Sequence, residues 1–175
     1  MILTTKEKQD MRRTVLALPV LAALLLAPAA TRAESGGKPI SLGLVTPVQI
    51  VPEAQGVSGF RFSLLYGNNA FVNGFDLGLV NMTSGGAEGV QWGAVSIVNG
   101  DFKGWQGNWI VSITNGGHFE GLQTGIYNQA KHVKGLQLGI VNQTDTMEGV
   151  QIGLVNIIHK GGMLPVFPFF NFSFK

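Results

Sequence analysis

Few residue types that carry out chemistry occur in this chain of 175 residues, and their spacing forms no catalytic or metal-binding pattern. There is no cysteine, which excludes disulfides, thiolate chemistry and cysteine-based zinc or iron–sulfur sites. The three histidines, His118, His132 and His159, form no His-x-x-x-His or His-Glu-x-x-His pattern. No serine lies in Gly-x-Ser-x-Gly. We therefore expect no catalytic residue, metal or cofactor, and a protein that is not an enzyme.

Three tryptophans are the candidates for an interaction site. Trp92, Trp105 and Trp109 fall close together in the middle of the chain. An exposed row of aromatic side chains could bind a glycan or a lipid headgroup, whereas the ordinary alternative is packing or an interfacial belt.

A repeat with a period near 15 residues organises the chain. Its units read Gly-apolar-Gln-apolar-Gly-apolar-Val-Asn, as at residues 135–142 and 149–156. Two units depart from the pattern: the Gly59 unit lacks the central glycine, and in the Gly104 unit Asn108 takes its place, which puts the stacking there in doubt. The units open at Gly59, Gly74, Gly89, Gly104, Gly121, Gly135 and Gly149, with spacings of 15, 15, 15, 17, 14 and 14 residues.

Within a unit the residues alternate with a period of two, which is the period of a β-strand. Positions 2, 4 and 6 are apolar, as in Val150, Ile152 and Leu154, and the other positions carry mainly glycine, glutamine and valine. Short polar pieces such as residues 143–146 separate the units and are typical of turns. We predict an all-β chain with about one main strand per unit.

Glutamine at position 3 and asparagine at position 8 recur from unit to unit. In a parallel stack, where like positions lie about 4.8 Å apart, the glutamine amides would form an outward-facing hydrogen-bonded ladder. Asparagine tolerates left-handed backbone and can bond its own turn, which suits a corner. The predicted ladder residues are Gln91, Gln106, Gln123, Gln137 and Gln151, together with Asn81, Asn128, Asn142 and Asn156.

These features favour a parallel β-solenoid and leave one alternative, a small antiparallel up-and-down β-barrel in an outer membrane. Residues 147–157 are long enough to cross an outer membrane at a tilt, and the chain ends on alternating aromatics. Charged residues precede the opening glycines and alternate in sign: Glu88, Lys103, Glu120, Lys134 and Glu148. In a solenoid, unlike charges would be neighbours, whereas a barrel would have one acidic and one basic rim. We predict the solenoid.

Residues 1–33 are typical of a cleaved secretory signal peptide, because Arg12 and Arg13 precede an apolar run and Ala33 ends a cleavage site. Without this segment, seven basic and eight acidic side chains remain. We therefore expect no nucleic-acid partner and no polybasic membrane patch. The predicted divisions that follow are an entry or cap segment at 34–58, a repeat array at 59–160 and an aromatic end strand at 161–175.

The repeat units resemble the bacterial surface-repeat family first described from leptospiral proteins. The resemblance rests on the Gly-apolar-Gln-apolar-Gly-apolar-Val-Asn units and on the ending at residues 164–168 and 171–174, and it runs from about Ser41 to Phe174. It implies an exported protein of the bacterial cell envelope, in the periplasm, the outer membrane or at the cell surface. It supplies no catalytic residues.

Together these observations predict a non-catalytic envelope protein that presents a rigid β surface for interaction. The glycine-rich face would let another flat surface approach closely, because positions 1 and 5 carry almost no side chain. The expected partner is a glycan, an envelope protein or a lipid, and the exposed end strands allow a homodimer. The alternative function is a small outer-membrane barrel with its apolar face toward lipid.

Overall fold

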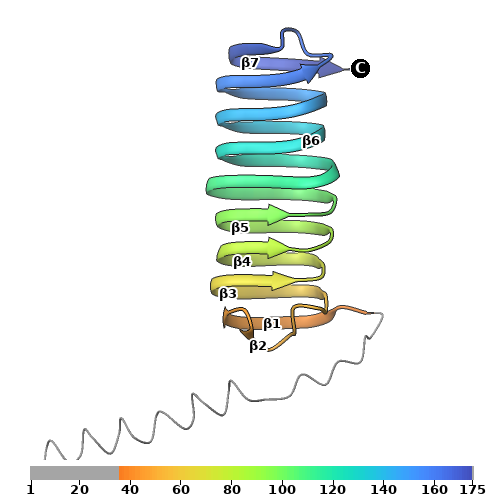
Figure 1. Ribbon diagram of the computed structural model, residues 1–175, viewed down its shortest axis with the longest axis vertical. Helices are drawn as coiled ribbons and strands as arrows, with labels where there is room; N and C mark the ends of the chain where they lie inside the picture. The colour runs from red at the N-terminus through yellow and green to blue at the C-terminus, as the bar shows by residue number, and fades with distance from the viewer. Residues whose placement is uncertain (1–35, 175) are drawn as a thin grey trace, which may run out of the picture. The chain divides into compact units, whose positions relative to one another are not determined.

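Parallel strands stacked one above another form the structure, as Figure 1 shows. The computed structural model describes residues 36–174, so the predicted signal peptide lies outside the described residues. The strands are β1 (Lys38–Val45), β2 (Val48–Gln49), β3 (Val57–Asn69), β4 (Val72–Thr83), β5 (Ala87–Val98), β6 (Phe102–Lys160) and β7 (Val166–Phe174). Residues 36–174 contain no helix that could span a membrane.

Neighbouring units pair in parallel and in register. Gly59 in β3 lies opposite Gly74 in β4, which is followed by Gly89 in β5 and Gly104 in β6. The sheet order is β2-β1-β3-β4-β5-β6-β7, and β6 winds through several coils of the stack (Figure 1). The predicted parallel β-solenoid is confirmed. The antiparallel barrel is wrong, because successive units run in the same direction with like positions stacked.

Within β6 the chain stays extended between units, where short polar pieces predicted turns, whereas bends at residues 84–85 and 99–100 separate β4, β5 and β6. Residues 143–146 lie within β6. Thr144 is buried there, and its hydroxyl lies 2.9 Å from the carbonyl oxygen of Lys131 and 2.8 Å from that of Thr146. Because every coil bends at the same place, the pairing between coils continues around the corner. Each unit therefore supplies two extended sides of a coil, where we expected one strand and a turn.

The inward and outward faces are the reverse of our expectation. Gln137 and Asn142 are fully buried, whereas Ile152 and Leu154 are 49% and 60% exposed. The outward-facing glutamine ladder and the glycine-rich docking face are therefore wrong. Glycine at positions 1 and 5 instead lets the backbones of adjacent coils approach each other, since a Cβ atom there would meet the carbonyl oxygen of the coil below.

An apolar core fills only one side of the interior. Phe102 and Phe119 are neighbours in it, with parallel rings 5.4 Å apart. The opposite side of the interior is polar and holds the glutamine and asparagine columns. The core consists of Val51, Val57, Val72, Ala87, Val98, Phe102, Phe119, Ala130, Val133, Met147 and Ile158.

Antiparallel strands close both ends of the stack. β2 pairs with β1, and β7 pairs with the last coil of β6, so that Phe172 lies opposite Val150. The backbone amide of Ile50 donates to the carbonyl of Leu42, and that of Met163 donates to the carbonyl of Phe172. These bonds use edge groups that would otherwise be available to pair with another chain.

The opening glycines generate a first prediction. Gly121 has a φ of 133°, a conformation that side chains rarely adopt, and its added Cβ would overlap the carbonyl oxygen of Gly104. We expect Gly121→Ala to lower the free energy of unfolding by about 3 kcal/mol. Urea unfolding followed by circular dichroism measures this. The control is Gly117→Ala, whose Cβ would lie at an ordinary 3.4 Å from Asp101 Oδ1. Equal midpoints for the two variants would contradict the role given to Gly121.

Candidate interaction surface

A ladder of buried amides runs along the polar side of the interior. Each glutamine at position 3 after Gln91 donates from Nε2 to Oε1 of the glutamine in the preceding coil. The successive distances are 3.0 Å for Gln106 to Gln91, 2.9 Å for Gln123 to Gln106, 2.7 Å for Gln137 to Gln123 and 2.7 Å for Gln151 to Gln137. The Nε2 groups of Gln106, Gln123 and Gln151 also reach backbone carbonyls, as Gln151 does to Ile157 at 3.1 Å. The ladder therefore joins neighbouring coils and also the two sides of one coil.

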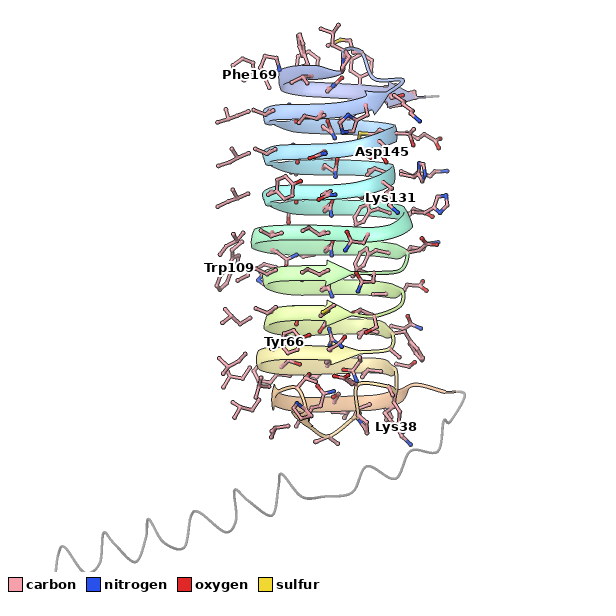
Figure 2. The ribbon with its side chains drawn as sticks, viewed as in Figure 1. Lys38, Tyr66, Trp109, Lys131, Asp145 and Phe169 are labelled. Carbon is pink, nitrogen blue, oxygen red and sulfur yellow. The ribbon has the colours of Figure 1, made fainter. Side chains whose placement is uncertain are left out.

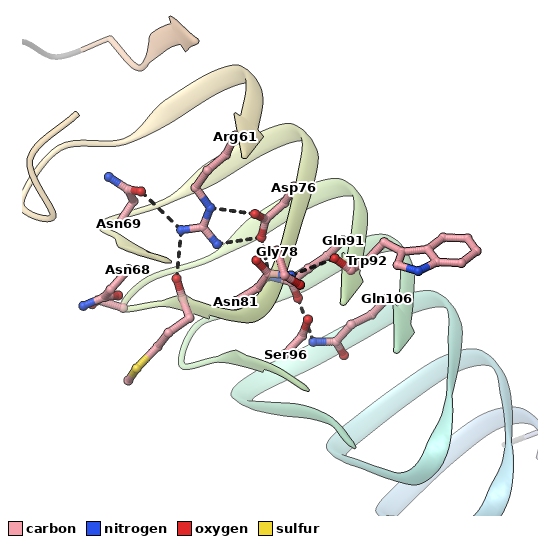
Figure 3. Close-up of polar contacts among 12 residues, drawn as sticks. Arg61, Asn68, Asn69, Asp76, Gly78, Asn81, Gln91, Trp92, Ser96 and Gln106 are labelled. Carbon is pink, nitrogen blue, oxygen red and sulfur yellow. Dashed lines mark hydrogen bonds and ion pairs between the residues drawn. The ribbon is translucent and has the colours of Figure 1, made fainter. Parts of the chain in front are cut away.

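An ion pair ends the ladder at its N-terminal side, as Figure 3 shows. Gln91 Nε2 donates to Asp76 Oδ2 at 2.7 Å, and Asp76 accepts two hydrogen bonds of 2.6 Å from Arg61. The guanidinium also donates to Asn69 Oδ1 and to the carbonyl of Met82. Both charged side chains are nearly fully buried. Since an ionised carboxylate only accepts hydrogen bonds, Asp76 fixes the direction in which every glutamine of the ladder donates.

The asparagine column runs the opposite way. Asn128 donates to Asn142 Oδ1 and Asn142 to Asn156 Oδ1, both at 2.8 Å. Each Nδ2 also reaches the next coil, as from Asn142 to the carbonyl of Ile152, and Asn156 bonds its own corner at Gly153. None of these asparagines has positive φ. Asparagine is therefore used here for its side-chain hydrogen bonds, and left-handed backbone plays no part.

Asn108 repairs the irregular unit. The column has serine at two successive positions, Ser96 and Ser112, where four other units have asparagine. The Asn108 side chain lies between them, accepting from Ser96 Oγ at 2.6 Å and donating to Ser112 Oγ at 2.7 Å. Gly104 keeps its register opposite Gly89. The stacking that the sequence put in doubt is therefore maintained.

The outside of the first side of each coil is a continuous apolar face. It is formed by positions 2 and 4, apart from Gly107 and Thr124 at position 4, and it includes half-buried members such as Leu138 and exposed ones such as Phe75, at 57%. Register extends it to Ile40 and Leu42 in β1 and to Phe170 and Phe172 in β7. We define the apolar face as Phe60, Phe62, Phe75, Leu77, Val90, Trp92, Trp105, Leu122, Leu136, Leu138, Val150 and Ile152, with these four end residues.

The apolar face continues around one corner of the coils. The corner residues are highly exposed, with Leu154 at 60% and Trp109 at 65%. The interior behind this corner is the polar asparagine column, so these side chains take no part in the apolar core. We define the apolar edge as Leu64, Leu65, Leu79, Trp109, Ile110, Ile126, Ile140, Leu154 and Val155.

The opposite corner carries the charges. Figure 2 places Lys131 and Asp145 on the opposite side of the stack from Trp109. Exposed unlike charges lie in adjacent coils, with Lys103 Nζ 3.8 Å from Glu120 Oε1 and Lys134 Nζ 3.7 Å from Glu148 Oε2. Such pairs contribute only about 0–1 kcal/mol each. We define the charged edge as Glu88, Asp101, Lys103, His118, Glu120, Lys131, His132, Lys134, Asp145, Glu148, His159 and Lys160.

Two of the three tryptophans meet on the apolar face. The rings of Trp92 and Trp105 are 5.1 Å apart in an edge-to-face arrangement. Trp105 lies over Gly107, where a Cβ would fall 2.8 Å from its Nε1, and this Nε1 donates to Thr124 at 3.4 Å. Trp109 stands apart on the apolar edge. The tryptophans thus belong to one larger apolar surface, which the alternation of residue types did not assign to the outside.

The three histidines lie at the charged edge and are exposed. The rings of His118 and His132 are 5.3 Å apart, and His118 Nδ1 lies 3.8 Å from Asp101. Among residues 36–174, no group of three or more histidine, cysteine or acidic side chains is arranged to hold a metal ion.

Comparison of the chain with protein-family models, with curated proteins and with solved structures finds no match. The resemblance to the surface-repeat family therefore stays a prediction.

Breaking the glutamine ladder should destabilise the fold. In Gln123→Leu, the buried Nε2 of Gln137 loses its acceptor, Gln123 Oε1, and Gln106 Oε1 loses one of its donors. An unsatisfied buried polar group costs about 1–3 kcal/mol, so we expect a loss near 3 kcal/mol. The control is Ile126→Gln, which changes a side chain that is 48% exposed. Urea unfolding should move the midpoint of the first variant alone, and similar midpoints would contradict a buried ladder.

The ion pair should be replaceable by two further glutamines. Asp76→Ala leaves Arg61 buried without its carboxylate, which we expect to cost about 3–5 kcal/mol. The double variant Arg61→Gln, Asp76→Gln removes both charges and gives all units glutamine at position 3. We expect it to recover most of the loss, and thermal unfolding measures the recovery. A double variant as unstable as Asp76→Ala would show that the ladder requires a charged end.

Proposed function

We propose that this protein is a non-catalytic, exported protein of the bacterial cell envelope that presents a rigid apolar β surface to a partner. The observation that carries the proposal is the continuous apolar face and apolar edge. Scattered apolar residues are normal on protein surfaces, but contiguous patches of more than a few hundred Å² mark sites of interaction. Here they follow the stack from β1 to β7.

The interior supports the rigidity of this surface. Backbone pairing joins each coil to its neighbours, and the glutamine and asparagine columns add side-chain bonds at every step. Outward side chains at positions 2, 4 and 6 are therefore held at the fixed spacing of the coils. Such a surface suits contact with an extended partner better than enclosure of a small substrate.

Export and envelope location are supported by the sequence. The basic and apolar segments before Ala33 have the order of a secretory signal, and the repeat units resemble those of the surface-repeat family. Cleavage after Ala33 leaves the whole solenoid in the exported part.

Cysteine labelling in intact cells tests the proposal, because the chain has no cysteine of its own. We introduce Ile140→Cys on the apolar edge or Lys131→Cys on the charged edge into the full chain. Both positions are exposed in the isolated protein. In cells whose outer membrane has been made permeable, we expect a polar maleimide to label Lys131→Cys at least about fivefold faster than Ile140→Cys, because a partner covers the apolar edge.

Labelling of denatured protein gives the reference for complete reaction, and mass measurement of the exported chain tests cleavage after Ala33. Two outcomes contradict the proposal. One is retention of the full chain in the cytoplasm, and the other is equal labelling of the two positions in the envelope.

A further inference from the structure

We infer that the apolar edge and the adjoining apolar face insert into one leaflet of a lipid bilayer, while the charged edge stays in water. The inference deepens the proposed function and rests on it, because it identifies what covers the apolar surface. The axis of the solenoid would lie along the membrane plane, with the strands of the apolar face pointing into the leaflet.

Sorting of charge around the coil is the first argument. Positions 2, 4, 6 and 7 of the units contain no charged residue. The charged residues of the repeat array lie at the opposite corner, apart from the buried pair Arg61 and Asp76. The cross-section thus has one apolar and one polar corner, as required of a body that lies across a membrane interface.

The depth of the apolar surface is the second argument. Five residue steps separate the opening glycine from position 6, which at about 3.3 Å per residue is about 16 Å. The hydrocarbon core of a bilayer is about 30 Å thick, so that one leaflet supplies about 15 Å. The apolar surface therefore matches one leaflet in depth.

Satisfaction of the backbone is the third argument. Unpaired backbone N–H and C=O groups are costly in hydrocarbon. In this solenoid the strand hydrogen bonds run along the stack, from coil to coil, so its sides present mainly side chains. At the two ends, β2 and the segment before β7 bond to part of each edge, through Ile50 and Met163.

The shape of the apolar surface favours lipid over a second copy of the chain. On the second side of each coil, the outward residues next to the edge are half-buried and mostly apolar, among them Val80, Val95 and Val141, and polar residues such as Gln129 and Gln143 follow. Apolar side chains therefore surround the apolar edge on both sides. A second copy packed on one flat face would leave the protruding edge in water, whereas fluid acyl chains can cover face and edge together.

The charged edge indicates the class of headgroup. It holds five acidic and four basic side chains that alternate along the stack, and no basic cluster. Attraction to anionic lipid through Lys and Arg is therefore absent as a driving force. We expect insertion into zwitterionic phosphatidylcholine vesicles that changes less than about twofold between 0.1 and 1 M salt.

Tryptophan fluorescence tests the inference in the full chain, because all three tryptophans lie in the solenoid and none in residues 1–33. One chain keeps only Trp109, through Trp92→Phe and Trp105→Phe. The matched control also has Trp109→Phe and carries Lys131→Trp on the charged edge. With phosphatidylcholine brominated near the middle of its acyl chains, we expect Trp109 to be quenched at least about twofold more than the control. Aqueous acrylamide should show the reverse order.

A second pair of variants tests the apolar edge itself. In the chain with Trp109 alone, Ile126→Glu with Ile140→Glu places two carboxylates on the edge, and we expect lipid quenching to fall about tenfold. Asn99→Glu with Asn115→Glu adds the same charge near the opposite corner and should leave quenching unchanged. Circular dichroism checks that each variant keeps its strands.

Three results would overturn the inference. Equal lipid quenching of the two tryptophan positions means that the edge does not enter the leaflet. Loss of vesicle binding in 1 M salt means that attraction to headgroup charge, and not insertion of the apolar edge, drives the binding. Protection of Trp109 from acrylamide without lipid quenching, together with a dimer in light scattering, assigns the surface to a second copy. That last result contradicts insertion into lipid but agrees with the proposed function. Equal labelling of Ile140→Cys and Lys131→Cys in cells would contradict both the proposed function and this inference.

Discussion

The buried amide ladder is the interaction on which the rest of this structure depends. A glutamine amide taken out of water needs both a donor and an acceptor, and the coil above and the coil below supply them at the strand spacing. Each rung therefore requires its neighbours at the same position, which holds the repeat in register. The ladder has a direction, set by Asp76 at one end, and Gln151 Oε1 at the other end has no partner among the described residues.

The polar interior also explains the unusual exterior. Apolar side chains fill only one side of the interior. The other side is held by glutamine, asparagine and the ion pair of Arg61 and Asp76. Apolar residues of the first face are therefore free to point outward. Burial on folding does not account for them, which is why we propose a partner for this face.

Period, fold and the stacking of like residues could be predicted from the sequence, because each depends only on spacing. Which face of the strands points into the interior could not be predicted from the sequence, since the alternation with a period of two is the same whichever face is buried. We placed Gln123 outside because amides are ordinarily solvated, and missed that a column of amides can satisfy itself. Arg61 and Asp76 were missed because their types differ from glutamine, although they occupy position 3 of the first two units and have opposite charge. The role of Asn108 was missed as well, although serine replaces asparagine at both Ser96 and Ser112 and so leaves a missing side-chain amide in the column.

The irregular unit shows how differently the two sides of the backbone are constrained. Inside, Asn108 restores the missing amide, and the register of Gly104 with Gly89 is unchanged. Outside, the pairing with β5 shifts between Gly93 and Val95, and the extra residue is accommodated at the corner that holds Trp109 and Ile110. The insertion therefore adds to the apolar edge its most exposed side chain. In this unit the change is compensated where it meets the asparagine column, and the extra residue is accommodated on the surface proposed to meet a partner.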